Sequence, residues 1–400
     1  MKKEAHVRKK HLPSFPFRGA AFAFLALLLL CWVAVFVHPD SFFLPGRAGT
    51  LPRANLVSEL DAFSAGSREA ASAAANHVSA GEEHFVIGEA ALSAPMPDAL
   101  SYGETYRARD VAEVVEDAVN AGLLSEEEKT VFSVTAALDK DSPILYYIDD
   151  SLLTICWQET VDGHLCTFCE VKTADPSQIR RKLSQDAFAP SSVVYPTDLA
   201  VSANAVAAVT GDGYSAHDLG ISVYQREIRR FKAWPYSFTR RCYNAVDTLF
   251  LDASGNFRFS PAGASWSREG IEQYVSENDI LFSLTSGPIL VADGQAMPQG
   301  GYPLGSPGRR AARSAIAQCG PLHYLYVSVS TADGRSGCTA SELAGMLQAK
   351  GVQHAYALSG GRSAELVFGG ELYRPLDNRS EKPCNDLIVF ATALPEKRGE

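Results

Sequence analysis

The sequence predicts an α+β fold in which a mixed β-sheet domain with flanking helices follows one N-terminal transmembrane helix and a flexible stalk. Residues 19–37 form an uncharged apolar run, and residues 38–95 are rich in Ala, Ser, Gly and Pro. From residue 144 onward, short β-rich runs alternate with turns rich in Gly, Asp, Asn and Pro. We therefore expect a basic tail (1–18), a transmembrane helix (19–37), a stalk (38–95), a small helical segment (96–143) and the sheet domain (144–394).

The apolar run at 19–37 has the length of a membrane-spanning helix, because residues that rise by about 1.5 Å each can cross a hydrocarbon core of about 30 Å. Six Lys and Arg residues precede it against one acid, Glu4, so the positive-inside rule places the tail in the cytoplasm. A cleaved signal peptide is the alternative, but the bulky residues Phe36 and Val37 do not suit a cleavage site. We predict a single-pass membrane protein with an extracytoplasmic C-terminal domain.

Charge and cysteine content exclude two classes of protein, nucleic-acid-binding proteins and disulfide scaffolds. The net charge of −10 gives no electrostatic basis for binding nucleic acid, and we expect none. Of eight cysteines, Cys31 lies in the apolar run, and the seven that remain cannot all pair within one chain. The spacing of the cysteines is irregular, so the domain is not a disulfide scaffold. The sequence leaves the oligomeric state open.

Helix signals mark the segment before the sheet domain. Apolar residues from Val111 to Val119 recur at helical spacing, Gly122 stands where a helix would end, and Ser125 with Glu128 forms a capping box for a second helix. A helical hairpin is the expected result.

A strand–helix–strand unit is predicted between residues 322 and 363. Its first strand is LHYLYVSVS, its helix begins at the capping box Thr339-Ala-Ser-Glu342, and its second strand is VQHAYAL. If the two strands are parallel in one sheet, the loops that follow them lie at the same carboxyl edge, where α/β sheets bind ligands. Five polar residues would then converge: Asp333, Arg335, Ser359, Arg362 and Ser363.

Several segments resemble, in order, motifs of the phosphodiester glycosidase family. They are A-V-T-G-D-G-Y (208–214), S-G-P-I-L-V-A-D-G (286–294), R-S-A-I (313–316), A-D-G-R (332–335), T-x-x-E-L-A (339–344), A-L-S-G-G-R-S (357–363) and N-D-L-I-V-F (385–390). The resemblance covers about residues 145–394. It implies a hydrolase of the N-acetylglucosamine-1-phosphodiester α-N-acetylglucosaminidase type, whose bacterial relatives are exopolysaccharide-related.

The chain departs from the family pattern at polar positions. Thr210 and Ala357 each stand where the family has Asn, Ser359 stands for Asp, and Arg362 stands for Gly. The resemblance implies that the three Asn and Asp positions, occupied here by Thr210, Ala357 and Ser359, touch the sugar or the reacting bond. A catalytically silent relative that binds glycan phosphate or assists envelope assembly is therefore a second hypothesis.

The chemistry of a sugar–phosphate diester requires a carboxyl group near the anomeric carbon and donors that hold phosphate. Asp212 and Asp333 match family positions and are the candidate catalytic groups, with a loop-capping Asp as the structural alternative. Arg313 and Arg335 are the candidate phosphate donors, with surface ion pairing as the alternative. Ser359, Arg362 and Ser363 complete the expected substrate site. We expect Asp212, Arg313, Asp333, Arg335 and Ser359 to line one cleft.

No cofactor or metal is expected. Cys166-x-x-Cys169 has no second ligand pair, and in a strand its two sulfurs would point to opposite faces, which prevents a disulfide between them. Gly263-Ala-Ser265-Trp-Ser267 ends in Ser where a serine-hydrolase elbow needs Gly. The favoured function is a membrane-anchored extracytoplasmic hydrolase of glycosyl phosphodiesters in cell-envelope or exopolysaccharide material.

Overall fold

The computed structural model describes part of the chain. The described residues are 107–108, 111–120, 122–126, 144–149, 151–185, 188–189, 191–232, 234–236, 241–331, 336–373 and 380–392. They belong to the second of two compact units, which spans Gly49–Glu400. The predicted tail, transmembrane run and stalk lie outside them, as do Asp333 and Arg335. Within the described ranges, no helix combines the length and apolar character that a membrane span requires.

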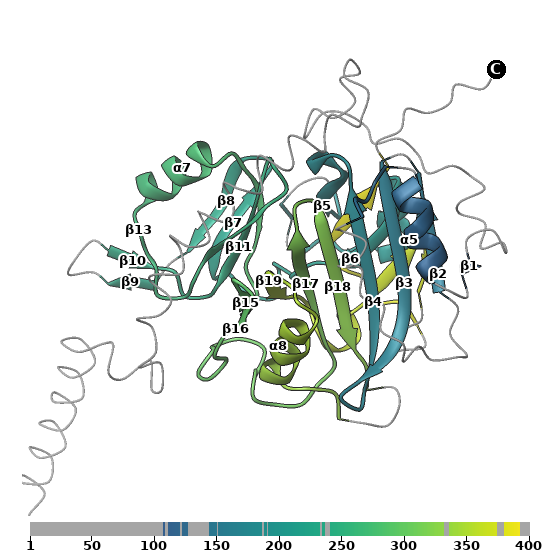
Figure 1. The fold of residues 1–400 in the computed structure, drawn as a ribbon. Helices are drawn as coiled ribbons and strands as arrows, with labels where there is room; N and C mark the ends of the chain where they lie inside the picture. Colours follow the sequence, from purple (N-terminus) through teal and green to yellow (C-terminus); the bar gives the residue numbers. More distant parts are fainter. Residues whose placement is uncertain are drawn as a thin grey trace, which may run out of the picture. The chain divides into compact units, whose positions relative to one another are not determined.

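A nine-stranded sheet is the largest element (Figure 1). Its strands lie in the order β1 (Arg107–Ala108), β2 (Ile144–Ile148), β3 (Leu152–Val161), β4 (His164–Thr173), β18 (His323–Val329), β17 (Arg313–Gly320), β19 (His354–Ala357), β15 (Ile289–Ala292) and β16 (Gln295–Ala296).

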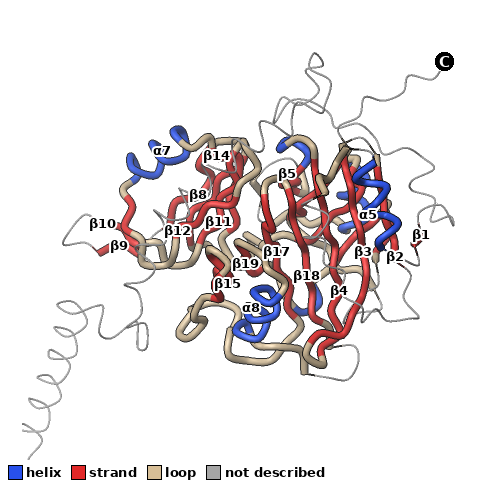
Figure 2. The backbone as a smooth tube through the Cα atoms, viewed as in Figure 1, coloured by secondary structure: helices blue, strands red, loops and turns tan. Residues whose placement is uncertain are grey.

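Two five-stranded sheets and a small three-stranded sheet complete the domain (Figure 2). The first has the order β12 (Phe257–Ser260), β11 (Thr248–Asp252), β14 (Ile280–Leu284), β7 (Gly220–Tyr224), β8 (Glu227–Lys232). The second has the order β21 (Glu371–Leu372), β20 (Leu366–Phe368), β6 (Ala205–Thr210), β22 (Asp386–Ala391), β5 (Ile179–Leu183). The small sheet has β13 (Ser265–Trp266), β10 (Arg241–Tyr243) and β9 (Trp234–Tyr236).

Helices cover the outer faces of these sheets. The α-helices are α5 (Val111–Asn120), α6 (Pro196–Ser202), α7 (Arg268–Glu277) and α8 (Ala340–Ala349), and the 3₁₀ turns are η3 (Pro176–Gln178) and η4 (Gly361–Ser363). One apolar core joins the nine-stranded sheet to both five-stranded sheets, and a second joins its other face to α5 and α8. The described domain is thus mostly β-sheet with few helices, as the sequence indicates.

The predicted strand–helix–strand unit is present. Thr339 caps α8 with the expected reciprocal bonds to Glu342. Strands β18 and β19 both pair antiparallel with β17, which lies between them, so β18 and β19 run in the same direction. Because β17 separates them, β18 and β19 do not pair with each other. Every strand pairing in the described sheets is antiparallel, so the expectation of a mixed sheet was wrong at the level of neighbouring strands.

The loops after β18 and β19 flank the start of β17, as expected for one sheet edge. Cys338 pairs with Ala311, and the Gly361 amide donates to the Ala312 carbonyl at 2.9 Å. Gly337 has a φ of +68°, and a Cβ there would lie 2.2 Å from the Ala311 carbonyl oxygen, so no larger residue fits. The close approach of these backbones also explains Gly360, where a Cβ would lie 2.7 Å from the Ala312 carbonyl oxygen.

The strand prediction for the C-x-x-C segment is confirmed, since β4 spans it. Cys169 lies in the core between the sheets, opposite Cys156 on β3, whereas Cys166 packs on the helix-covered face. Both are free thiols.

We predict that peptide mapping of the unreduced protein by mass spectrometry will find no link between Cys166 and Cys169, because the sheet separates their sulfurs. Detection of that link in folded protein would contradict the strand geometry of β4.

Candidate functional site

Three motif segments meet at the end of β6. The Gly211 amide donates to the Asp386 carbonyl at 3.1 Å, and the Ser359 amide donates to the Gly211 carbonyl at 3.1 Å. The Ser359 hydroxyl lies 3.0 Å from the position that a Cβ on Gly213 would take. The structure therefore brings Asp212 and Ser359, two of the predicted site residues, onto adjoining backbone segments.

A buried ion cluster lies beneath this junction. Arg181 on β5 donates to Asp212 Oδ1 at 2.7 Å and to Asp386 Oδ2 at 2.9 Å, and all three side chains are at most 1% exposed. The second Asp212 oxygen accepts the Thr285 amide, and the second Asp386 oxygen accepts the Gly213 amide at 3.3 Å. Both oxygens of Asp212, a predicted catalytic carboxylate, thus accept hydrogen bonds from the protein itself.

The cluster holds two carboxylates against one guanidinium. Burial raises the pKa of Asp386 to about 6, with the Asp212 charge acting in the same direction and Arg181 opposing both. Asp386 belongs to the N-D-L-I-V-F motif, but sequence reasoning assigned it no role. Arg181 was missed as well, although it stands at an inward position of β5 between the buried Ile179 and Leu183.

A second carboxyl group lies on the motif loop before β20. Glu365 is 5% exposed, and its backbone pairs with Thr210: the Thr210 amide donates to the Glu365 carbonyl at 3.1 Å, and the Glu365 amide donates to Thr210 Oγ1 at 3.2 Å. Its Oε1 accepts the Lys382 amide at 2.9 Å, whereas its Oε2 has no hydrogen-bond partner among the described residues. Burial raises the pKa of Glu365 to about 7.

Glu365 was not predicted from the sequence. The available signal was a single acid directly before an apolar strand and two residues after a quoted motif. A carboxyl with one unsatisfied oxygen and a pKa near neutrality is the kind of group that transfers protons in active sites.

The remaining predicted binders on the loop are partly exposed. Arg362 is exposed, and the Ser363 hydroxyl accepts from the Lys382 ammonium at 2.7 Å. Lys382, which the sequence reasoning did not select, adds a second cation beside Arg362 on this side of the site.

Arg313 lies at the start of β17 and points into a set of backbone carbonyls. Its guanidinium donates to Cys338 at 2.9 Å, Ser306 at 3.0 Å and Arg309 at 2.6 Å, and burial lowers its pKa. These bonds fasten the loop before β17. They do not join Arg313 to Asp212, and whether Arg335 lies beside it stays a prediction because Arg335 is outside the described residues.

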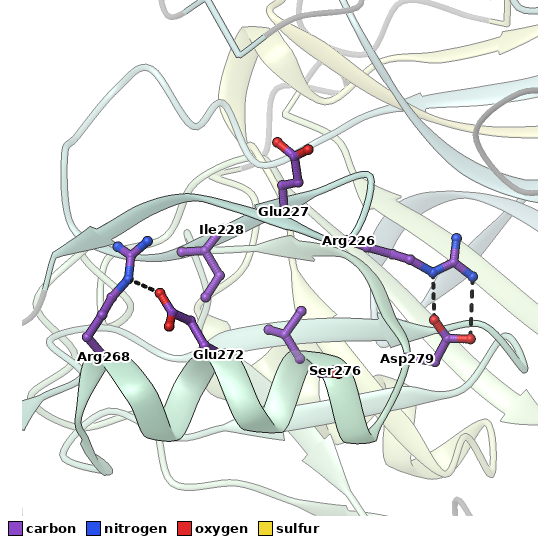
Figure 3. Close-up of a pocket in the computed structure, with 8 residues that line it drawn as sticks. Arg226, Glu227, Ile228, Arg268, Glu272, Ser276 and Asp279 are labelled. Carbon is purple, nitrogen blue, oxygen red and sulfur yellow. Dashed lines mark hydrogen bonds and ion pairs between the residues drawn. The ribbon is translucent and has the colours of Figure 1, made fainter.

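A shallow cavity of about 340 Å³ lies elsewhere, between β8 and α7 (Figure 3). Four of its charged side chains are paired with one another, Arg226 with Asp279 and Arg268 with Glu272, each at 2.6 Å. No motif residue lines it. We therefore do not assign the site to this cavity.

Comparison with known proteins identifies the same family as the motifs did. Residues 203–391 match the phosphodiester glycosidase family. This confirms the resemblance that the motifs indicated, and the matched range includes β6, β17, β19, β20 and β22. No curated protein matches the chain.

Two solved structures are similar at low identity. The catalytic domain of zebrafish N-acetylglucosamine-1-phosphodiester α-N-acetylglucosaminidase, auto-inhibited by its pro-peptide, has 15% identity and a TM-score of 0.44, over 65% of this chain and 85% of that one. A hypothetical protein from Synechocystis has the same identity and TM-score, over 62% of this chain. This chain spans 64% of the Synechocystis protein, less than two thirds of its length.

The ion cluster predicts a large effect of Arg181→Met on stability. The substitution leaves two buried carboxylates without their cation, a loss worth roughly 3–5 kcal/mol in free energy of unfolding. Denaturant unfolding measures it, with Arg180→Met, on the other face of β5, as the matched control. Equal effects of the two variants would show that the cluster does not stabilise the fold.

The raised pKa of Glu365 predicts a pH dependence of stability. The folded state holds this proton more tightly than the unfolded state, so the stabilisation is complete below the ordinary pKa of 4.5 and is lost as pH rises through about 7. Between about pH 5 and about pH 8, wild type should lose about 1–2 kcal/mol more than Glu365→Gln, because the folded state gives up its extra proton over this range. Parallel pH profiles of the two proteins in denaturant unfolding would refute the assignment.

Proposed function

We propose that this domain is a hydrolase of glycosyl phosphodiesters in cell-envelope or exopolysaccharide material, held at the extracytoplasmic side of a membrane by residues 19–37. The family match over residues 203–391 supports the hydrolase class. The observation that carries the proposal is the meeting of the 211–213 turn, the 359–365 loop and the start of β22, together with Glu365 on that loop, a carboxyl group with a near-neutral pKa.

In this proposal Glu365 acts as the general acid. Its raised pKa keeps the carboxyl group protonated near neutral pH. Its Oε2 has no hydrogen-bond partner among the described residues, so no protein group there competes for that proton. Water attacks the anomeric carbon, the bond from that carbon to the phosphate oxygen breaks, and the Glu365 proton passes to the departing phosphate. Asp333 remains the predicted partner that activates water.

Charge on the loop suits a phosphate group. Arg362 is exposed and Lys382 is bonded to Ser363, so two cations lie along one loop edge. Asp212 has a positioning role in this scheme, because its oxygens accept from Arg181 and Thr285 and hold the turn that underlies Ser359.

A second candidate, a catalytically silent glycan-phosphate-binding protein, is favoured by one observation. Ser359 places a hydroxyl beside Gly213, where the family resemblance implies a carboxylate. Binding through the cations of the loop would not require that carboxylate.

Turnover of sugar 1-phosphate diesters by the full chain tests the proposal. Glu365→Gln should lower kcat by ~10²–10⁴, because the general acid is lost, while the exposed Glu371→Gln on the neighbouring strand should leave the rate nearly unchanged. The wild-type rate should fall as pH rises above about 7, and this alkaline limb should disappear in Glu365→Gln. A fully active Glu365→Gln would exclude Glu365 as the acid.

The silent-relative hypothesis predicts a different outcome from the same assay. Wild type would bind these diesters without turnover, and the double substitution Ala357→Asn with Ser359→Asp would create hydrolysis by restoring the family-like polar groups. Turnover by wild type at a rate that this double variant does not exceed would refute that hypothesis.

A further inference from the structure

One group of side chains outside the motif segments combines three kinds of atom that bind transition metals. Glu170, Cys319 and His323 offer a carboxylate oxygen, a sulfur and an imidazole nitrogen, and these atoms all lie within 4.8 Å of one another. They come from β4, β17 and β18, which are neighbours in the nine-stranded sheet and lie side by side in Figure 1.

The strand register explains why these side chains share one face. Leu325 pairs with Glu170 and His323 pairs with Lys172, so Glu170 and His323 lie diagonally across two strands on the same face. The pairing of β17 with β18 shifts between Gln318 and Gly320. Cys319 falls at this irregularity and packs on the helix-covered face, the face to which Leu325 belongs.

The cluster is buried and partly preorganised. The Nε2 atom of His323 lies 2.6 Å from Glu170 Oε1, and each side chain is 5% exposed. Cys319 is half-buried. The nearby Lys172 ammonium is bonded to the Pro321 carbonyl at 3.1 Å and, having no lone pair, cannot be a ligand.

We propose that Glu170, Cys319 and His323 form a binding site for one divalent transition-metal ion of the zinc class. Imidazole nitrogen, thiolate sulfur and carboxylate oxygen are the donors of such sites, and three protein ligands leave a fourth position for water or another ligand. A thiolate and a carboxylate together neutralise a divalent cation, which favours its burial. Binding releases the Cys319 thiol proton to solvent.

The geometry requires only a local adjustment. Ligand atoms around a tetrahedral zinc ion lie roughly 3.2–3.8 Å apart, given the usual zinc–ligand bond lengths. The most widely separated atoms of the cluster therefore approach by at most roughly 1–1.6 Å, and the Glu170–His323 contact opens by roughly 1 Å to admit the ion. Rotation of the side chains can supply movements of this size while the strands stay in register.

Cobalt titration of the full chain tests the site, because Co²⁺ substitutes for zinc and a cobalt–thiolate bond gives a charge-transfer absorption. The reduced, chelator-treated protein should bind one Co²⁺ per chain with this absorption, and Zn²⁺ should displace it whereas excess Mg²⁺ or Ca²⁺ should not. Cys319→Ser should abolish the absorption. His323→Gln and Glu170→Gln should each weaken binding by more than about 10-fold.

Cys384→Ser is the matched control, since Cys384 is another half-buried thiol and is not part of the cluster; it should retain the absorption. Should Cys319→Ser fail to fold by circular dichroism, alkylation of wild type decides the question: Zn²⁺ should protect Cys319, read by peptide mass spectrometry, and leave Cys384 reactive. Absence of the cobalt–thiolate absorption in wild type, its persistence in Cys319→Ser, or equal alkylation of Cys319 with and without Zn²⁺ would overturn the proposal.

Discussion

The placement of Arg181 between Asp212 and Asp386 is the constraint on which the junction of the motif loops depends. Arg181 and Asp386 lie on adjacent strands of one five-stranded sheet, and Arg181 also donates to the Ser283 carbonyl on β14 of the other. Asp212 accepts the Thr285 amide directly after that strand. The cluster thus connects both five-stranded sheets beside the 211–213 turn after β6. It fixes the conformation of that turn, whose backbone bonds to Ser359.

The burial of this cluster dictates the residues around it. A Cβ on Gly211 would lie 2.1 Å from Asp386 Oδ2, so only glycine allows the turn to pass over the carboxylate. An ion cluster with almost no solvent exposure is stable only when every oxygen is bonded, and here the amides of Gly213 and Thr285 complete the set that Arg181 begins. The Gly-Asp-Gly motif therefore has a structural explanation that does not require Asp212 to touch substrate.

Local signals in the sequence were sufficient to predict the strand–helix–strand unit. The capping box at Thr339, the apolar stripe of α8 and the two flanking apolar runs predicted β18, α8 and β19 and the shared edge of their loops. The sequence could not show that β17 would lie between β18 and β19, because strand order is set by long-range packing. Arg181 and Glu365 were missed for the same reason: their burial depends on segments far away in the chain, and propensity carries no signal for that.

Two of the departures from the family pattern, Thr210 and Ser359, lie at one hydrogen-bonded junction between β6 and the 359–365 loop. Thr210 uses its hydroxyl in two local bonds, donating to the Ser363 carbonyl and accepting from the Glu365 amide, so it closes the loop that carries Glu365. An Asn at 210 would bring a larger amide group to the same place beneath the loop. The hydroxyl at Ser359 and the carboxyl at Glu365 lie on that one loop, and Thr210 links its end to β6. Thr in place of Asn at position 210 therefore has a structural consequence, because its hydroxyl fixes the backbone of the loop that carries both Ser359 and Glu365.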